Sequence, residues 1–283
     1  MMEAIDISES NVKDFSEILG EDLSEDVVKR IYYRGIGVTE DDGSAVGAMV
    51  CELLNADQDE EDRECMIHFL KSGDNEGFDA LHSFYKDRTV EEEGIVASAY
   101  ELYDESEAKA LEEVRFSLQK KESKTIRLTL ETLSKSKIAH AKQLPKHICS
   151  IEELSILQFR DAVKQILFKG HPGLLDDISY LPMTWFDCKV SACVISEDLV
   201  PGLFLIRRTL SGMLIPVLFC AYGAESQKNL LNMMKYSAKK AVELYQPEDT
   251  VVIMRMKQHI RALTDRLFPD IAGDEVFTGA RKE

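Results

Sequence analysis

The spacing of apolar residues along the first 120 residues predicts alternating short strands and helices. An apolar stripe at helical spacing over residues 27–32 predicts a helix that begins near Ser24. The Asp-Gly pair within Glu40–Ser44 supplies the left-handed residue of a tight turn, so this segment is expected to join two strands. The expected strands cover residues 4–7, 35–39, 45–54 and 65–70, the expected helices cover residues 12–19, 24–33, 78–85 and 106–120, and residues 96–103 fit either.

The second half of the chain continues this mixture. Thr125–Leu133 alternates between apolar and polar residues, which predicts a half-buried strand. Ser150 and Glu153 have the spacing of a capping box and predict the start of a helix. Pro216 is expected at a bulge or a sheet edge, because proline cannot donate to a strand ladder. Further strands are expected over residues 189–195, 203–209, 214–222 and 250–256, and further helices over residues 226–245 and 260–267.

The two halves share one order of elements, which indicates an internal repeat. The best local match pairs Gly35–Asp41 with Ala192–Asp198, and Met66–Gly73 then pairs with Pro216–Gly223. The offset is 157 residues at the first match and 150 at the second, so a short insertion or deletion relates the copies. The similarity is one of pattern rather than identity, and a chance match is the competing interpretation.

Charge divides the chain into two different parts. Residues 1–110 contain 30 Asp and Glu against 9 Lys and Arg, whereas residues 111–283 contain 21 against 25. All seven prolines follow residue 144. A chain of 283 residues, 45% of them hydrophobic, is long enough for two medium-sized domains with their own cores. We therefore expect an acidic domain over residues 1–124 and a second domain over residues 125–283.

The net charge of −17 argues against nucleic acid and anionic membranes as partners, because the acidic half would repel both. The longest apolar run, Met213–Ala221, is shorter than the ~20 residues that a membrane-spanning helix needs. The six cysteines form no C-x-x-C pair and lie mostly in apolar runs, which predicts buried thiols in a reducing compartment. With an acidic N-terminus that lacks an apolar segment, these features predict a cytoplasmic protein.

The common short motifs for metal and nucleophile chemistry are missing from the sequence. The patterns H-E-x-x-H, G-x-S-x-G and G-x-x-x-x-G-K-[ST] do not occur. Cys188 and Cys193 have no paired histidines nearby, so no metal site is expected.

A three-strand meander, then a helix, a strand and a helix, with helices before the meander, resembles the fold of the GNAT-type N-acetyltransferases. The residues that carry the resemblance are Tyr33–Leu54 in the first copy and Leu203–Phe268 in the second. The two copies together would cover nearly the whole chain. The resemblance implies an α/β (α+β) protein with two GNAT-like mixed-sheet domains in tandem, and acetyl-CoA or another acyl-CoA as the cofactor.

In that superfamily the helix after the fourth strand turns its first N–H groups to the pyrophosphate of acyl-CoA, since a helix N-terminus favours anions. The matching stretch is Cys220–Asn229, so the resemblance implies cofactor binding by the residues around the turn: Ala221, Tyr222, Gly223, Gln227 and Lys228. The stretch departs from the family pattern Gln/Arg-x-x-Gly-x-Gly/Ala. No Gln or Arg stands three residues before Gly223, and Glu225 puts a carboxylate near the phosphate position. The first copy has Lys71–Gly77 here, which is also acidic.

Amide formation needs a base for the amine and an acid for the thiolate that leaves. In the first copy Glu52 and Glu64, on the meander strands, are candidate bases, and His68 is an alternative. The resemblance implies that a tyrosine after the fifth strand is the acid, which here means Tyr100 or Tyr103. We take Glu52, His68 and Tyr103 as the candidate catalytic set. Each also fits a structural role, as a solvated carboxylate, a packed histidine or a core aromatic.

The sequence leaves two main functions open. One is an acyl-CoA-dependent N-acyltransferase whose acidic first copy receives a small cationic amine. The other is a non-catalytic binding protein on the same scaffold, whose acidic half docks a basic protein face. The order of elements and the division of charge favour the first. The departures in the phosphate loops, and Lys257–His259 in place of a tyrosine in the second copy, support the second as the alternative. A sensor of anions or small metabolites that uses Lys228, Lys235 and Arg207 is a third hypothesis.

Overall fold

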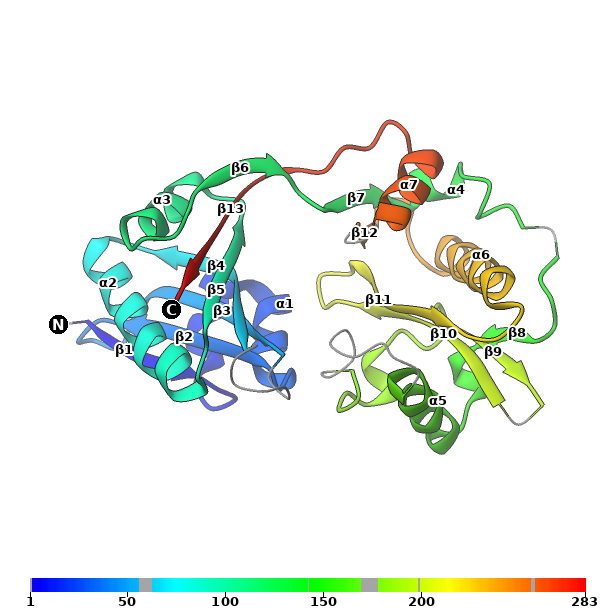
Figure 1. Cartoon of the computed structure of the whole chain (residues 1–283), viewed down its shortest axis with the longest axis horizontal. Coiled ribbons are helices and arrows are strands. Elements are labelled where there is room, and N and C mark those ends of the chain that lie inside the picture. The colour runs from blue at the N-terminus through cyan, green and yellow to red at the C-terminus, as the bar shows by residue number, and fades with distance from the viewer. Residues whose placement is uncertain (1, 56–62, 142, 169–177, 198, 256–257) are drawn as a thin grey trace. The chain divides into compact units, whose positions relative to one another are not determined.

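The chain divides into two compact units, each with its own mixed sheet (Figure 1). In the computed structural model, unit 1 comprises Met1–Glu122 with Glu275–Glu283, and unit 2 comprises Ser123–Asp274. The structure describes residues 2–55, 63–141, 143–168, 178–197, 199–255 and 258–283. Within these ranges, no helix has both the length and the apolar character to cross a bilayer.

Unit 1 is a mixed sheet with helices on both faces. Its strands are β1 (Glu3–Ile7), β2 (Tyr33–Thr39), β3 (Ala45–Leu54), β4 (Glu64–Ser72), β5 (Ala97–Leu102), β6 (Gln119–Glu122) and β13 (Glu275–Lys282). Its helical segments are η1 (Val12–Phe15), α1 (Ser16–Lys29), α2 (Asn75–Phe84), the π-helical turn η3 (Tyr85–Glu91) and α3 (Glu105–Glu113). The strand order is β1-β2-β3-β4-β5-β13-β6; β4 and β5 are parallel, and the other neighbours are antiparallel.

The core of unit 1 lies on both faces of this sheet. Phe15, Leu19 and Val27 from η1 and α1 pack against one face, and α2 and α3 cover the other. Each fully buried side chain of this size contributes roughly 1.5–3 kcal/mol to folding. Gly37 of β2 lies directly under the ring of Phe15, where a Cβ would collide with the ring. The glycine in this strand therefore allows η1 to pack closely against the sheet.

Unit 2 repeats this architecture. Its strands are β7 (Thr125–Thr129), β8 (Ile148–Ser150), β9 (Ala192–Ser196), β10 (Leu199–Arg208), β11 (Leu214–Ala221) and β12 (Thr250–Met254). Its helical segments are α4 (Leu130–Ser134), η4 (Ile151–Glu153), α5 (Ile156–Phe168), η5 (Met183–Trp185), α6 (Ser226–Leu244) and α7 (Gln258–Leu267). The strand order is β7-β12-β11-β10-β9-β8, with β11 parallel to β12 and the other neighbours antiparallel.

The two faces of this sheet also carry separate cores. Helix α5 packs Phe159, Val163 and Ile166 on one face, and α6 packs Met233 and other residues on the opposite face. A Cβ at Gly202 of β10 would lie 2.9 Å from Val194 Cγ2, so a glycine is required there. The order of elements in the two units agrees with the predicted α/β tandem architecture.

The internal repeat is visible in a shared irregularity of the meander. His68 is an extra residue of β4, because Val50 pairs with Phe69 and the next residue of β3 pairs with Ile67. Val217 is the corresponding extra residue of β11, at the register shift beside Pro216. A bulge of this kind bends the strand and leaves the extra residue outside the ladder. The bulge prediction for Pro216 is thus confirmed.

The final strand of each repeat lies in the sheet of the other unit. Strand β7 follows β6 in the chain but pairs with β12 of unit 2. Strand β13 follows α7 but lies between β5 and β6 of unit 1. The expected second domain, residues 125–283, differs from unit 2 at its end, because Glu275–Glu283 complete the first sheet. Local periodicity shows that a segment is a strand, but it does not show which sheet the strand joins.

One predicted helix start lies at a different residue. Ser150 caps only the single turn η4, by accepting a hydrogen bond from Glu152 N at 3.0 Å. The longer helix α5 begins after Ser155, whose Oγ accepts from Gln158 N at 3.2 Å. The Gln158 side chain accepts in return from Ser155 N at 2.9 Å. The capping box of α5 is therefore the second Ser-x-x-Gln/Glu pattern in this segment.

The exchanged strand β13 has little room at Gly279, where a Cβ would collide with the Ser117 carbonyl oxygen and the Tyr100 ring. We expect Gly279→Ala to lower the free energy of unfolding of the full chain by about 2–3 kcal/mol, because overpacking shifts the backbone. Urea unfolding followed by circular dichroism measures this. Gly73→Ala is the control, since its Cβ would approach no described atom closer than 3.4 Å. An equal loss in both variants would contradict the packing argument.

Candidate functional site

In each unit two parallel strands begin side by side and then separate. Strands β4 and β5 pair over Glu64–Ile67 of β4, and β4 continues to Ser72. In unit 2 the pairing of β11 with β12 is confined to Leu214 and Val251 among the described residues, and β11 continues to Ala221. Early separation of a parallel pair leaves backbone groups without a ladder partner and opens the sheet. Helices α2 and α6 start just beyond these openings.

Helix α6 presents an N-terminus without a side-chain cap. Its N-cap residue, Glu225, makes no capping hydrogen bond with its side chain. Ser226 N donates to Gly223 O at 3.2 Å, and Gly223 adopts a φ of 91°, so the chain turns sharply into the helix. The first N–H groups of a helix have no intrahelical partner, and the helix dipole favours an anion beside them. The start of α6 is therefore suited to a phosphate group.

The residues predicted for cofactor binding are brought together at the junction of β11 and α6: Ala221, Tyr222, Gly223, Gln227 and Lys228. The Tyr222 hydroxyl donates to Gln165 Oε1 on α5 at 2.5 Å. Lys228 Nζ lies 3.2 Å from Glu225 Oε1, and more than half of both side chains is exposed. An exposed ion pair of this kind contributes little to stability. Lys228 can therefore exchange Glu225 for the anion of a ligand.

A buried polar side chain on the first turn of α6 was not found from the sequence. Asn229 is 7% exposed, and its Oδ1 has no hydrogen-bond partner among the described residues. Buried polar groups are nearly always paired, so a donor from outside the chain, such as a water molecule or a ligand, would satisfy this acceptor. Asn229, Met233 and Ser237 follow one another at intervals of four residues on the buried face of α6. Two polar residues on this otherwise apolar face are the sequence feature that could have indicated a buried polar group.

The corresponding opening of unit 1 is filled by the unit's own carboxylates. Asp74 caps α2 by accepting from Gly77 N at 2.8 Å. Glu107 Oε1 accepts from Ser72 N, at the free end of β4, at 3.2 Å. Burial raises the pKa of Glu107. Because these acceptors occupy N–H groups at the end of β4 and the start of α2, that helix start is less open to an anion than the start of α6.

Two of the predicted catalytic residues are in contact on the sheet of unit 1. His68 Nε2 and Glu52 Oε2 are 2.9 Å apart, between β4 and β3. Arg30 Nη2 lies 3.1 Å from the other carboxylate oxygen of Glu52. Tyr33 stacks on His68 with their ring centroids 5.7 Å apart. The bulge of β4 thus places His68 beside Glu52.

The contacts of Glu52 set its protonation state. Burial raises the pKa of Glu52, but the hydrogen bond with His68 and the charge of Arg30 outweigh burial, so the pKa is lowered overall. A carboxylate that stays ionised can orient an imidazole and stabilise its protonated form. About a third of the His68 side chain is exposed, so a ligand can reach it. The pair can therefore accept a proton at His68.

The remaining catalytic candidates have different surroundings. Tyr103 follows β5, and half of its side chain is exposed. Tyr100 is buried, and its hydroxyl donates to Ser117 O at 3.1 Å, which gives it a structural role. Glu64 is exposed at the start of β4. Tyr103 is therefore the tyrosine that is open to a ligand.

Unit 2 has other residues at the positions of Glu52 and His68. The bulges align Glu52 with Arg207 and His68 with Val217. Arg207 is 4% exposed, and its guanidinium carbon lies 4.4 Å from the centre of the Trp185 ring. The two units therefore carry opposite charges at equivalent positions. Within the described ranges, no three His, Cys, Asp or Glu residues come together as a metal site.

Two mixed sheets, each with a bulged meander strand, a separating parallel pair and a helix at the opening, define a tandem GNAT-type N-acetyltransferase fold. Solved structures show the same architecture. A tandem GNAT protein from the clavulanic acid biosynthesis pathway has a TM-score of 0.63 at 7% identity, covering 100% of this chain and 98% of that one.

Two further solved structures extend the comparison. N-myristoyltransferase from Saccharomyces cerevisiae, solved with myristoyl-CoA, has a TM-score of 0.54 at 12% identity, covering 99% of this chain and 79% of that one. A GCN5-related N-acetyltransferase from Sphaerobacter thermophilus has a TM-score of 0.51 at 9% identity, covering 99% and 95%. Neither a protein-family model nor a curated protein matches the sequence. At these identities the likeness shows the fold of the chain.

The lowered pKa of Glu52 predicts a pH-dependent contribution to stability. The contribution is fully present above the ordinary glutamate pKa of about 4.5 and is lost as pH falls through the lower folded-state pKa. We expect Glu52→Gln to lower the free energy of unfolding by about 1–2 kcal/mol at pH 7 and to matter progressively less below pH 4.5. Urea unfolding at a series of pH values measures the difference. Glu64→Gln, at an exposed position, is the control; a deficit for Glu52→Gln that does not change with pH would exclude the ionised pair.

Proposed function

We propose that the chain is an acyl-CoA-dependent N-acyltransferase whose second unit holds the acyl-CoA. The observation that carries this proposal is the start of α6, an uncapped helix N-terminus beside a sheet opening. The N–H groups and Lys228 would hold the pyrophosphate. Asn229 Oδ1, which is buried and has no partner, would accept a hydrogen bond from an amide of the pantetheine arm. Bound acyl-CoA would supply an activated thioester.

Turnover in unit 1 would need an acyl-CoA at the sheet opening of that unit as well, because a general base must lie within hydrogen-bond reach of the reacting amine. For that reaction we propose Glu52 and His68 as the acid–base pair. His68 would remove a proton from an attacking amine, and Glu52 would stabilise the imidazolium that results. Tyr103 is the proposed proton donor to the thiolate. The acceptor we propose is a small cationic amine, because unit 1 contains 35 Asp and Glu against 14 Lys and Arg. We place the protein in the cytoplasm, since its six cysteines are free thiols.

One observation favours a non-catalytic alternative. In unit 2, where acyl-CoA fits best, Arg207 and Val217 replace the acid–base pair. A chain that binds acyl-CoA there without turning it over would be a binding protein that offers its acidic face to a basic protein partner. Binding and turnover therefore need separate measurements.

Titration calorimetry with acetyl-CoA tests the binding site. We expect one tight site, with about tenfold weaker binding in Lys228→Glu, because a carboxylate then faces the pyrophosphate. Lys240→Glu is the matched control. It lies on the same helix and has the same type of pair with a glutamate three residues away, but at the far end. Equal losses in the two variants would indicate a general charge effect, and no binding to the wild type would exclude the proposal.

Release of free CoA in the presence of spermidine or a lysine-rich peptide tests turnover. We expect His68→Gln to lower kcat at least about 100-fold, with a smaller effect on KM, because a general base contributes roughly 10²–10⁴-fold. Glu64→Gln, an exposed carboxylate on the same strand, should leave kcat unchanged. Acetyl-CoA binding without any CoA release would support the non-catalytic alternative instead.

A further inference from the structure

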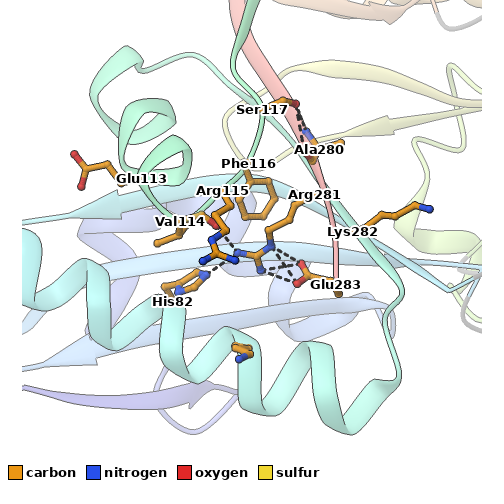
Figure 2. A pocket seen from close by; sticks show the side chains of 11 residues that line it. His82, Glu113, Val114, Arg115, Phe116, Ser117, Ala280, Arg281, Lys282 and Glu283 are labelled. Carbon is orange, nitrogen blue, oxygen red and sulfur yellow. Dashed lines mark hydrogen bonds and ion pairs between the residues drawn. The ribbon is translucent and has the colours of Figure 1, made fainter.

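A cavity of about 830 Å³ opens in unit 1 beside the carboxyl ends of α2 and α3 (Figure 2). Its walls come from His82 of α2, Lys86 of η3, residues 113–117 at the end of α3 and just after it, and residues 280–283 at the end of the exchanged strand and just after it. The sheet opening of unit 1 lies at the other end of α2, where the helix begins. The cavity is therefore separate from the sheet opening of unit 1, and all its lining residues belong to unit 1.

The centre of the cavity is already organised as a receptor for a carboxylate. Arg281 Nη2 lies 2.8 Å from both carboxylate oxygens of Glu283, and Nε lies 3.1 Å from each. Arg281 Nη1 donates to Val114 O at 2.9 Å, and its guanidinium carbon lies 4.4 Å from the centre of the Phe116 ring. Only 13% of the Arg281 side chain is exposed. Arg281 is thus held rigidly, with one edge turned to an anion.

Arg115 adds a second guanidinium at a conformational cost. Phe116 N donates to Leu111 O, and Arg115 N donates to Glu112 O, which is the Schellman pattern at the end of a helix. The left-handed residue of this pattern is usually glycine, but here Arg115 adopts it, with a φ of 74°. Figure 2 shows the Arg115 and Arg281 side chains directed toward His82. An arginine kept in a strained conformation beside another arginine indicates a function for its charge.

The cavity gathers basic side chains in a strongly acidic unit. Lys86 and Arg115 form no ion pair with any described residue, although unit 1 has 35 acidic residues. Figure 2 shows Glu113 and Lys282 directed away from the centre. Burial and the charges of Arg281 and Lys86 lower the pKa of His82, partly offset by Glu283. Inside the cavity Glu283 is left as the balancing carboxylate.

We propose that this cavity binds a small polyvalent oxoanion, a molecule with phosphate or carboxylate groups, through Arg115, Lys86 and Arg281. The ligand takes the place of Glu283 at the guanidinium of Arg281 and also binds Arg115 and Lys86, which line the same cavity. The three cations come from three separate segments around a space of 830 Å³. A ligand that contacts all three therefore needs more than one negative group.

Titration calorimetry of the full chain with pyrophosphate and with citrate, at a constant ionic strength of about 0.15 M, tests the proposal. We expect saturable binding of at least one probe, and the tighter one identifies the ligand group. Arg115→Gly should weaken binding at least tenfold. Its melting temperature should stay equal or rise, because glycine suits the left-handed position. The loss of binding then cannot come from unfolding.

Three further variants make the outcome decisive. Glu283→Gln should tighten binding several-fold, because the competing carboxylate is removed. Lys13→Ala, at an exposed lysine outside the cavity, should leave binding unchanged. If Lys228→Glu abolishes binding and Arg115→Gly does not, the anion sits at α6 and the proposal is overturned. It is equally overturned if neither probe binds saturably to the wild type.

Discussion

The loss of hydrogen-bonding partners between two parallel strands is the constraint on which both openings depend. A bulge bends β4 at His68 and β11 at Val217, and beyond it each strand runs on without its parallel neighbour. The backbone groups freed in this way must find other partners. In unit 1 the chain supplies one itself, from the carboxylate of Glu107. In unit 2 the helix that follows begins without a side-chain cap and with a buried amide oxygen, on Asn229, that has no partner.

The two units therefore have the same fold but differently charged side chains at equivalent positions. On the third meander strand, unit 1 has a histidine where unit 2 has a valine. On the strand before it, unit 1 has a glutamate where unit 2 has a buried arginine. The charge difference follows the boundary between the units, with a strong acidic excess in unit 1 and a slight basic excess in unit 2. The two copies therefore share the bulge in the meander and differ in the side chains beside it.

Much of the fold was predictable because it is local. The meander strands, the bulge beside Pro216 and the long helix α6 follow from periodicity, turn residues and the chemistry of proline. The contact between Glu52 and His68 was not predictable, because an extra residue in one strand changes which face a side chain takes. The left-handed Arg115 was hidden for a related reason: a non-glycine residue gives no local indication of that conformation. The destination of the last strand depends on partners more than 150 residues away.

The exchange of strands between the units has a consequence for the order of events during synthesis. The N-terminal unit is made first, yet its sheet ends at β5 until residues 275–282 have been made, because the ladder of β6 is with β13. Until then, the edge of β5 and the backbone of β6 expose unpaired groups, which are the usual starting points of misassembly. The second unit faces no such delay, because β7 precedes the rest of its sheet in the chain. Maturation of the nascent protein should therefore proceed from the second unit to the first, against the direction of translation.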